Sequence, residues 1–119
     1  QPFLLVPYTT DVNDIRFWRG NFQSGDDFAE YGCDTFDQLN REATSDVPVM
    51  MTIGVHPKII GRPGRIHGLA RLIDHIRASP GAWITRRQEI ASGWLDAGPR
   101  KTEDRVIGQG EQSMDPSNS

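Results

Sequence analysis

The apolar residues of this chain fall into three short continuous runs, each followed by a stretch with helical spacing. The runs are residues 3–6, 47–55 and 82–84. Runs of this length without alternation are typical of strands that are buried on both faces, as in parallel sheets. Pro7 and Pro57 follow the first two runs and favour the end of each strand there.

Three helices are predicted after these runs. Asp26 or Asp27 is a suitable N-cap for the first helix, whose apolar residues recur at helical spacing. The second helix is predicted to begin near Pro63, because proline fits the first turn of a helix. Thr85 and Gln88 have the spacing of a capping box and predict the start of the third.

The alternation of strand and helix predicts an α/β fold with a parallel sheet and right-handed crossovers. Three such units form either a small open sheet or part of a (β/α) barrel. A sheet of three apolar strands leaves two edges uncovered, which favours pairing with another chain. We therefore expect residues 1–96 to be part of a larger domain, and residues 97–119, which contain few apolar side chains, to form a mobile tail.

Composition and charge narrow the classes of function. The 119 residues include 13 Lys and Arg against 16 Asp and Glu, and the net charge of -3 is too weak to gather polyanions, so no nucleic acid partner is expected. No membrane span or secretion signal is visible, which predicts a cytoplasmic protein without membrane contact. The single Cys33 excludes an intramolecular disulfide, and we interpret it as a packing residue of the first helix.

Two polar clusters, residues 8–16 and 56–65, follow the first two predicted strands. Functional groups of parallel α/β folds collect after the carboxyl ends of strands. His56 comes directly after the second strand, and Asp11 and Asp14 are carboxylates that could orient its ring for proton transfer to a leaving amine. The spacing also fits a structural histidine that bonds a loop carbonyl, with the carboxylates closing local turns.

Further basic residues surround the start of the second predicted helix. Arg62 and Arg65 could bind an anion or a substrate carbonyl there, although a solvated loop explains the same residues. His67 and His75 lack the i, i+4 spacing of a helical metal site, so we interpret both as surface residues. No metal ligands are predicted within the chain.

At these clusters the chain resembles the polysaccharide deacetylase (NodB homology) family, specifically its allantoinase-like branch. The resembling stretches are Val6–Phe17, Met50–Pro57 and Ile60–Arg65, with a further likeness at residues 83–91. The stretches occur in the family's order, and the likeness covers about residues 3–95. The resemblance implies the C-terminal half of a distorted (β/α) barrel that hydrolyses amide-type C–N bonds in N-acetylated sugars, ureides or cyclic imides.

The resemblance also implies roles for individual residues. His56 corresponds to the family's general acid, and the segment from Asp11 to Asp14 lines the site and orients that histidine. The candidate substrate-binding residues are Tyr8, Asn13 and Arg62. The family's N-terminal Asp pair and His-x-x-x-His motif have no counterpart in this sequence, so the base, and any divalent metal such as zinc, would depend on a complementing N-terminal half.

Two hypotheses about function follow. In the first, the chain and a complementing N-terminal half form a hydrolase of carbohydrate metabolism that acts on a small amide, a ureide or an N-acetylated sugar. In the second, the chain is a non-catalytic α/β module that binds a partner or forms a homo-oligomer through its open sheet edges.

Overall fold

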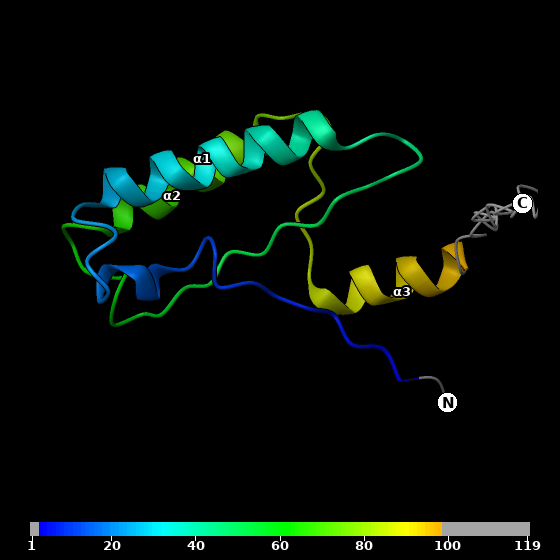
Figure 1. Ribbon diagram of the computed structural model, residues 1–119, viewed down its shortest axis with the longest axis horizontal. Helices are drawn as coiled ribbons and strands as arrows, with labels where there is room; N and C mark the ends of the chain where they lie inside the picture. The colour runs from blue at the N-terminus through cyan, green and yellow to red at the C-terminus, as the bar shows by residue number, and fades with distance from the viewer. Residues whose placement is uncertain (1–2, 99–119) are drawn as a thin grey trace, which may run out of the picture.

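The computed structural model describes residues 3–98, which contain helices joined by long extended segments (Figure 1). In chain order the helical elements are the 3-10 helix η1 (Asp14–Phe17), α1 (Gly25–Glu42), α2 (Ile66–Arg77) and α3 (Arg87–Ala97). Helices α1 and α2 lie side by side, whereas α3 lies apart from them, near the N-terminal segment. The three predicted α-helices are therefore present, although α3 is capped by Arg86 with Glu89 and not by the predicted Thr85–Gln88 box.

Helix α1 begins earlier than the sequence analysis expected. Ser24 is the N-cap: its Oγ accepts a hydrogen bond from the N–H of Asp27 at 3.2 Å, and the Asp27 carboxylate accepts one from the N–H of Ser24 at 2.9 Å. This reciprocal pair is a capping box. The predicted caps, Asp26 and Asp27, were wrong because a serine with an acidic residue three positions later satisfies two backbone donors at once.

Glycine and leucine residues set the close contact between α1 and α2. A Cβ atom on Gly32 would lie 2.6 Å from Cδ2 of Leu72, and one on Gly68 would overlap the carbonyl group of Gly25. The two backbones can therefore approach closely only because these positions carry no side chain. Phe28 and Leu72 are fully buried at this contact.

Aromatic rings connect η1 and the loop after it to α1. The ring centroid of Phe17 lies 5.5 Å from that of Phe22 and 6.2 Å from that of Phe28, and Phe22 meets Phe28 edge-to-face at 5.7 Å. Such contacts stabilise the packing beyond the burial of area alone. Ile59 and Ile60 complete the same core from the turn that precedes α2.

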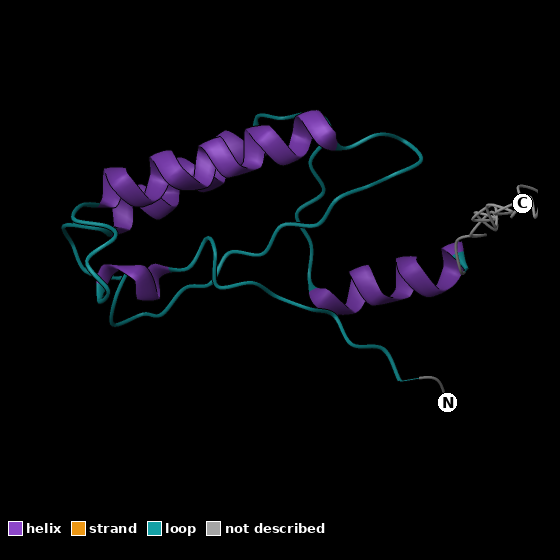
Figure 2. Cartoon of the chain, in the orientation of Figure 1, coloured by secondary structure: helices purple, strands orange, loops and turns teal. Residues whose placement is uncertain are grey.

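The predicted strands 3–6, 47–55 and 82–84 do not form a sheet within the described residues, and no strand is drawn there in Figure 2. What remains of the expected pairing is one isolated parallel bridge between Asn13 and Gly54. These segments are extended but lack the row of hydrogen bonds that makes a ladder. The predicted parallel sheet is thus not confirmed within residues 3–98, while the three helices that alternate with it are.

The exposure of the apolar runs gives the physical reason. Phe3 is 90% exposed, Leu5 75%, Trp83 67% and Ile84 59%. A strand forms only when a neighbouring strand takes its backbone hydrogen bonds, and residues 3–98 do not bring such neighbours together. Part of the apolar surface that was expected to be buried is therefore exposed, although Met51, Ile53 and Ala82 pack against the helical core.

Two further predictions concern the membrane and the C-terminal end. None of the helices in residues 3–98 is long and apolar enough to cross a membrane. Helix α3 ends at Ala97, one residue past the predicted domain boundary at 96. The predicted mobile tail falls, from residue 99 onward, outside the described residues.

Candidate active site

A fully buried carboxylate and a half-exposed imidazole form the most distinctive polar contact of the molecule. Asp14, the first residue of η1, has 0% of its side chain exposed, and its Oδ1 lies 2.6 Å from Nδ1 of His56. The His56 side chain is 51% exposed. The structure thus joins the two predicted clusters through the aspartate and histidine that were singled out in the sequence.

The second oxygen of Asp14 is held as firmly as the first. Oδ2 accepts hydrogen bonds from the backbone N–H groups of His56 at 2.7 Å and of Ile60 at 3.1 Å. An ionised carboxylate can only accept, so with an ionised Asp14 the proton of this contact lies on Nδ1 of His56, and Nε2 takes no part in the contact. The pair therefore fixes the ring and presents one nitrogen outward.

Local backbone geometry explains how residues so distant in sequence meet. The N–H of Asp14 donates to the carbonyl of Gly54 at 3.0 Å, and the N–H of Gly54 donates to the carbonyl of Val12 at 2.9 Å. A Cβ on Gly54 would overlap the side chain of Asn13, so glycine is needed for this approach. The Asn13 carboxamide in turn accepts from the N–H of Ile15 at 2.9 Å and starts η1.

Asp11, the other candidate partner for the histidine, is engaged elsewhere. The hydroxyl of Tyr31 donates to its Oδ1 at 2.6 Å, and the Arg16 guanidinium lies 3.6 Å from the same oxygen. Arg16 also lies over the ring of Tyr31, with 4.4 Å between Cζ and the ring centroid. The structure therefore brings Asp14, and not Asp11, to His56, while Asp11 ties the loop to α1.

A cavity of about 290 Å³ opens beside His56. Its lining residues are Tyr8, Asn13, Thr52, Ile53, Gly54, Val55, His56 and Arg87. Three of the predicted site residues, Tyr8, Asn13 and His56, therefore border one pocket. Their roles in binding or catalysis stay predictions.

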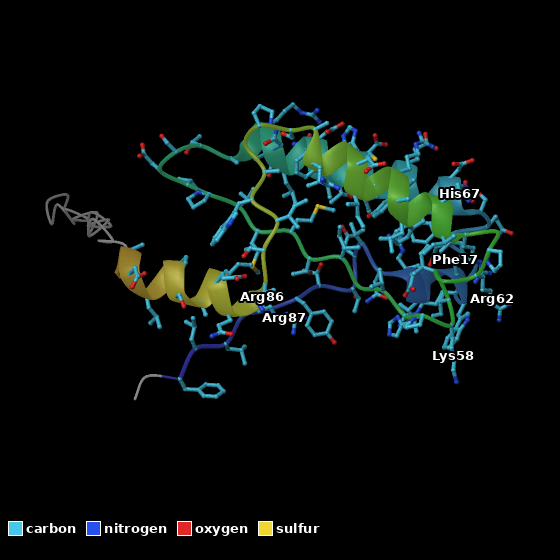
Figure 3. The ribbon with its side chains drawn as sticks, turned by 180° about the vertical axis from the view of Figure 1, so that it is seen from behind. Phe17, Lys58, Arg62, His67, Arg86 and Arg87 are labelled. Carbon is cyan, nitrogen blue, oxygen red and sulfur yellow. The ribbon has the colours of Figure 1, made fainter. Side chains whose placement is uncertain are left out.

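Among the five lining residues that were not predicted, Arg87 alone carries a charge. It follows Arg86 at the start of α3, where Figure 3 shows both side chains beside the N-terminal segment. Two adjacent cations at a helix N-terminus are unfavourable for the helix dipole. That local conflict was the available signal, because such conflicts concentrate at functional sites.

Arg62 does not reach this pocket. Its Nε donates to the carbonyl of Lys58 at 3.2 Å, and Figure 3 shows both residues at the right-hand end of the view, well away from Arg87 at the start of α3. Arg65 stacks over the ring of Phe17, with 4.3 Å between Cζ and the centroid. The anion site predicted for these two arginines is therefore not part of the pocket beside His56.

The remaining candidate side chains contribute to the contact between α1 and α2. Nε2 of His67 lies 3.4 Å from Asp26, and Nε2 of His75 lies 2.7 Å from Asp37, so each histidine faces a carboxylate of the neighbouring helix. Burial raises the pKa of the Cys33 thiol. A raised pKa lowers the thiolate fraction, which agrees with a packing role.

The described residues do not by themselves fit a metal ion. Within 3–98, no three or more His, Cys, Asp or Glu side chains are placed to hold one. Both oxygens of Asp14 and Nδ1 of His56 already take part in hydrogen bonds, so within the pair only Nε2 of His56 is left to bind a metal ion. A zinc site of the usual kind needs at least three protein ligands.

No family model matches the chain. A Schizosaccharomyces pombe protein named "Putative polysaccharide deacetylase" is 43% identical over 99 residues, which cover 82% of this chain and 31% of that protein. The solved structure of Puue allantoinase superimposes with a TM-score of 0.74 at 43% identity. The structure titled "probable Polysaccharide deacetylase from Pseudomonas aeruginosa PAO1" gives a TM-score of 0.74 at 39% identity.

This chain is homologous to the polysaccharide deacetylases. The resemblance seen in the sequence, including its allantoinase-like character, is confirmed. Each structural match covers 79% of this chain and 31% of the other protein, so the chain spans about a third of the length of its relatives. The fold of this polysaccharide deacetylase homologue follows the corresponding part of those proteins, although the barrel strands are not formed among the described residues.

Proposed function

We propose that this chain supplies the general acid of a hydrolase that cleaves amide-type C–N bonds. The observation that carries the proposal is the contact between buried Asp14 and His56, 2.6 Å long, at the edge of a cavity. Homology to a polysaccharide deacetylase and to an allantoinase supports the class of reaction.

The geometry suits one proton transfer. Asp14 holds Nδ1 in place, which leaves Nε2 at the edge of the cavity to carry the proton that the reaction needs. Water adds to the carbonyl carbon, the C–N bond breaks, and its electron pair leaves with the nitrogen. His56 gives its Nε2 proton to that nitrogen, while Asp14 stays ionised throughout.

The group that activates the water is proposed to come from a complementing segment. The relatives are about three times as long as the part that this chain matches. The chain together with that segment is called the completed enzyme below. We propose N-acetylated sugars, ureides and cyclic imides as its substrate classes.

Native mass spectrometry and an activity assay test the proposal together. The first measurement identifies the polypeptide that accompanies the purified chain, and the second follows hydrolysis of one substrate from each class. His56→Ala in the completed enzyme is expected to lower the rate by about 10²- to 10⁴-fold, the usual contribution of an acid or base. His75→Ala is the matched control, since His75 also contacts a carboxylate, at 2.7 Å, but lies away from the cavity.

Full activity of the His56→Ala protein would contradict the proposal. So would a completed enzyme that hydrolyses none of the three substrate classes.

A second candidate function rests on the uncovered apolar residues of the extended segments, of which Phe3 and Leu5 are 90% and 75% exposed. Such segments can pair with those of another copy and form a homo-oligomer without catalysis. Mass spectrometry would then find copies of this chain alone, and His56→Ala would leave the assembly unchanged.

A further inference from the structure

A cation borders the pocket beside His56 and takes no part in the proposed proton transfer. Arg87 lines the cavity together with His56 and Asn13, and its Cζ lies 5.3 Å from the ring centroid of Tyr8. The attraction between a cation and the face of an aromatic ring at this distance uses none of the cation's N–H donors in a hydrogen bond. The N–H donors at its edge therefore remain available to a ligand.

The neighbouring arginine shows what a structural role looks like at this helix start. Arg86 is paired with Glu89, with 2.8 Å between Nη2 and Oε1, and its hydrogen bonds, together with one from the Thr85 hydroxyl, lower the pKa of Glu89 to about 2. The pair offsets the unfavourable charge of Arg86 near the helix N-terminus. Arg87 has no carboxylate within 4.0 Å among residues 3–98, so its charge is not offset in this way.

The charge of the pocket indicates the kind of ligand. None of its eight lining residues is acidic, one is a permanent cation, and His56 can become a second. The carboxylate of Asp14 lies behind the ring of His56 with both oxygens bonded. A cavity with this lining favours a negatively charged group over a neutral one.

We propose that Arg87 binds a carboxylate carried by the amide substrate, while His56 faces the bond to be cleaved. The planar fork of a guanidinium matches the two oxygens of a carboxylate. The substrate class is therefore an amide or ureide with an acidic group nearby. The position of the scissile bond rests on the proposed function, whereas the charge preference does not.

A pair of probes that differ only in charge tests the assignment. The full chain is titrated with N-acetylglycine and with its neutral counterpart N-acetylglycinamide, and binding is followed by NMR chemical shifts. The wild-type chain is expected to bind N-acetylglycine about tenfold more tightly, the usual size of a charge-assisted hydrogen bond. Arg87→Gln is expected to abolish that preference, and Arg86→Gln, the matched control, to keep it.

The assignment is overturned if the wild-type chain shows no preference or binds neither probe, or if Arg87→Gln retains the preference. Failure of the proposed function gives a different result. If the completed enzyme hydrolyses none of the substrates but the preference for N-acetylglycine still depends on Arg87, the proposed hydrolase is wrong and the anion site stands. If the enzyme is active and needs His56, but the preference for N-acetylglycine does not depend on Arg87, only the anion site is wrong.

Discussion

Replacing Asp14 with alanine is expected to destabilise the fold far more than replacing any exposed carboxylate. The substitution removes three acceptor contacts at once: those to the backbone N–H groups of His56 and Ile60, and that to the His56 ring. The Asp14 side chain is 0% exposed, so water cannot reach the released donors unless the turn opens. The substitution therefore removes the hydrogen bonds that hold residues 56–60 against η1.

The magnitude follows from the number of donors left without a partner. A buried N–H group that loses its acceptor costs about 1–3 kcal/mol; the contact to Ile60 is buried, whereas that to His56 is part-buried and costs less, so we expect a loss of about 2–4 kcal/mol. The ring of His56 is half exposed and can turn toward water, so it adds little. Asp11→Ala is the matched control in the same loop: its carboxylate is 52% exposed, and the expected loss is about 1 kcal/mol or less.

Urea unfolding of the full chain, followed by tryptophan fluorescence, measures both losses. Amide hydrogen exchange adds a local reading, because the N–H of Ile60 should exchange much faster in the Asp14→Ala protein than in the Asp11→Ala protein. Equal urea midpoints for the two variants, with unchanged exchange at Ile60, would refute the assignment of Asp14 as a buried acceptor.

Two further predictions concern the helices. Gly32→Val should destabilise the α1–α2 contact by about 1–3 kcal/mol, because the new side chain meets Leu72, whereas Gly81→Ala should be nearly neutral; equal melting temperatures of the two variants would contradict this packing. Hydrogen bonds from the backbone N–H of Gln23 and of the next residue lower the pKa of Asp27. The ionised Asp27 therefore stabilises the fold fully above its ordinary pKa of 3.8, and this stabilisation is lost as the pH falls through the lower pKa of the folded state. Asp27→Asn should accordingly make the free energy of unfolding in urea less sensitive to acid. An unchanged acid sensitivity would contradict this role of Asp27.

The helices could be predicted from the sequence because their signals are local. Apolar spacing marks the buried face of each helix. Helix α2 ends at Arg77, shortly before Pro80, which cannot continue a helix. The start of α1 was misplaced by two or three residues because several polar residues there can cap a helix. Ser24 is the N-cap because it exchanges two hydrogen bonds with Asp27, and these bonds are seen only in the folded turn.

The strands could not be predicted as reliably, because pairing is not a local property. The apolar run 47–55 has the composition of a buried strand, but Val47 and Val55 are each 46% exposed here. Burial of such a run requires neighbours on both sides, and the chain spans about a third of its relatives. The sequence therefore indicated that these residues suit a buried strand, while residues 3–98 lack the neighbouring strands that would bury them.

The candidate site was predictable in part. His56 and both carboxylates were identified by their places after apolar runs, yet the choice between Asp11 and Asp14 depended on the bridge at Gly54, which no spacing rule contains. Arg87 was missed because an arginine at a helix start looks like a solvated charge. Its place in the cavity follows from the way α3 lies beside Tyr8.

The dependence of the rate on the leaving group tests the role of His56 most directly. In the completed enzyme, the loss caused by His56→Ala is measured with two ureides that the enzyme hydrolyses: one whose leaving amine is strongly basic, and one whose leaving amine is weakly basic and departs with little help. A general acid at His56 predicts a loss of about 10²- to 10⁴-fold for the first ureide and a much smaller loss for the second. The same loss for both substrates would contradict protonation of the leaving nitrogen by His56.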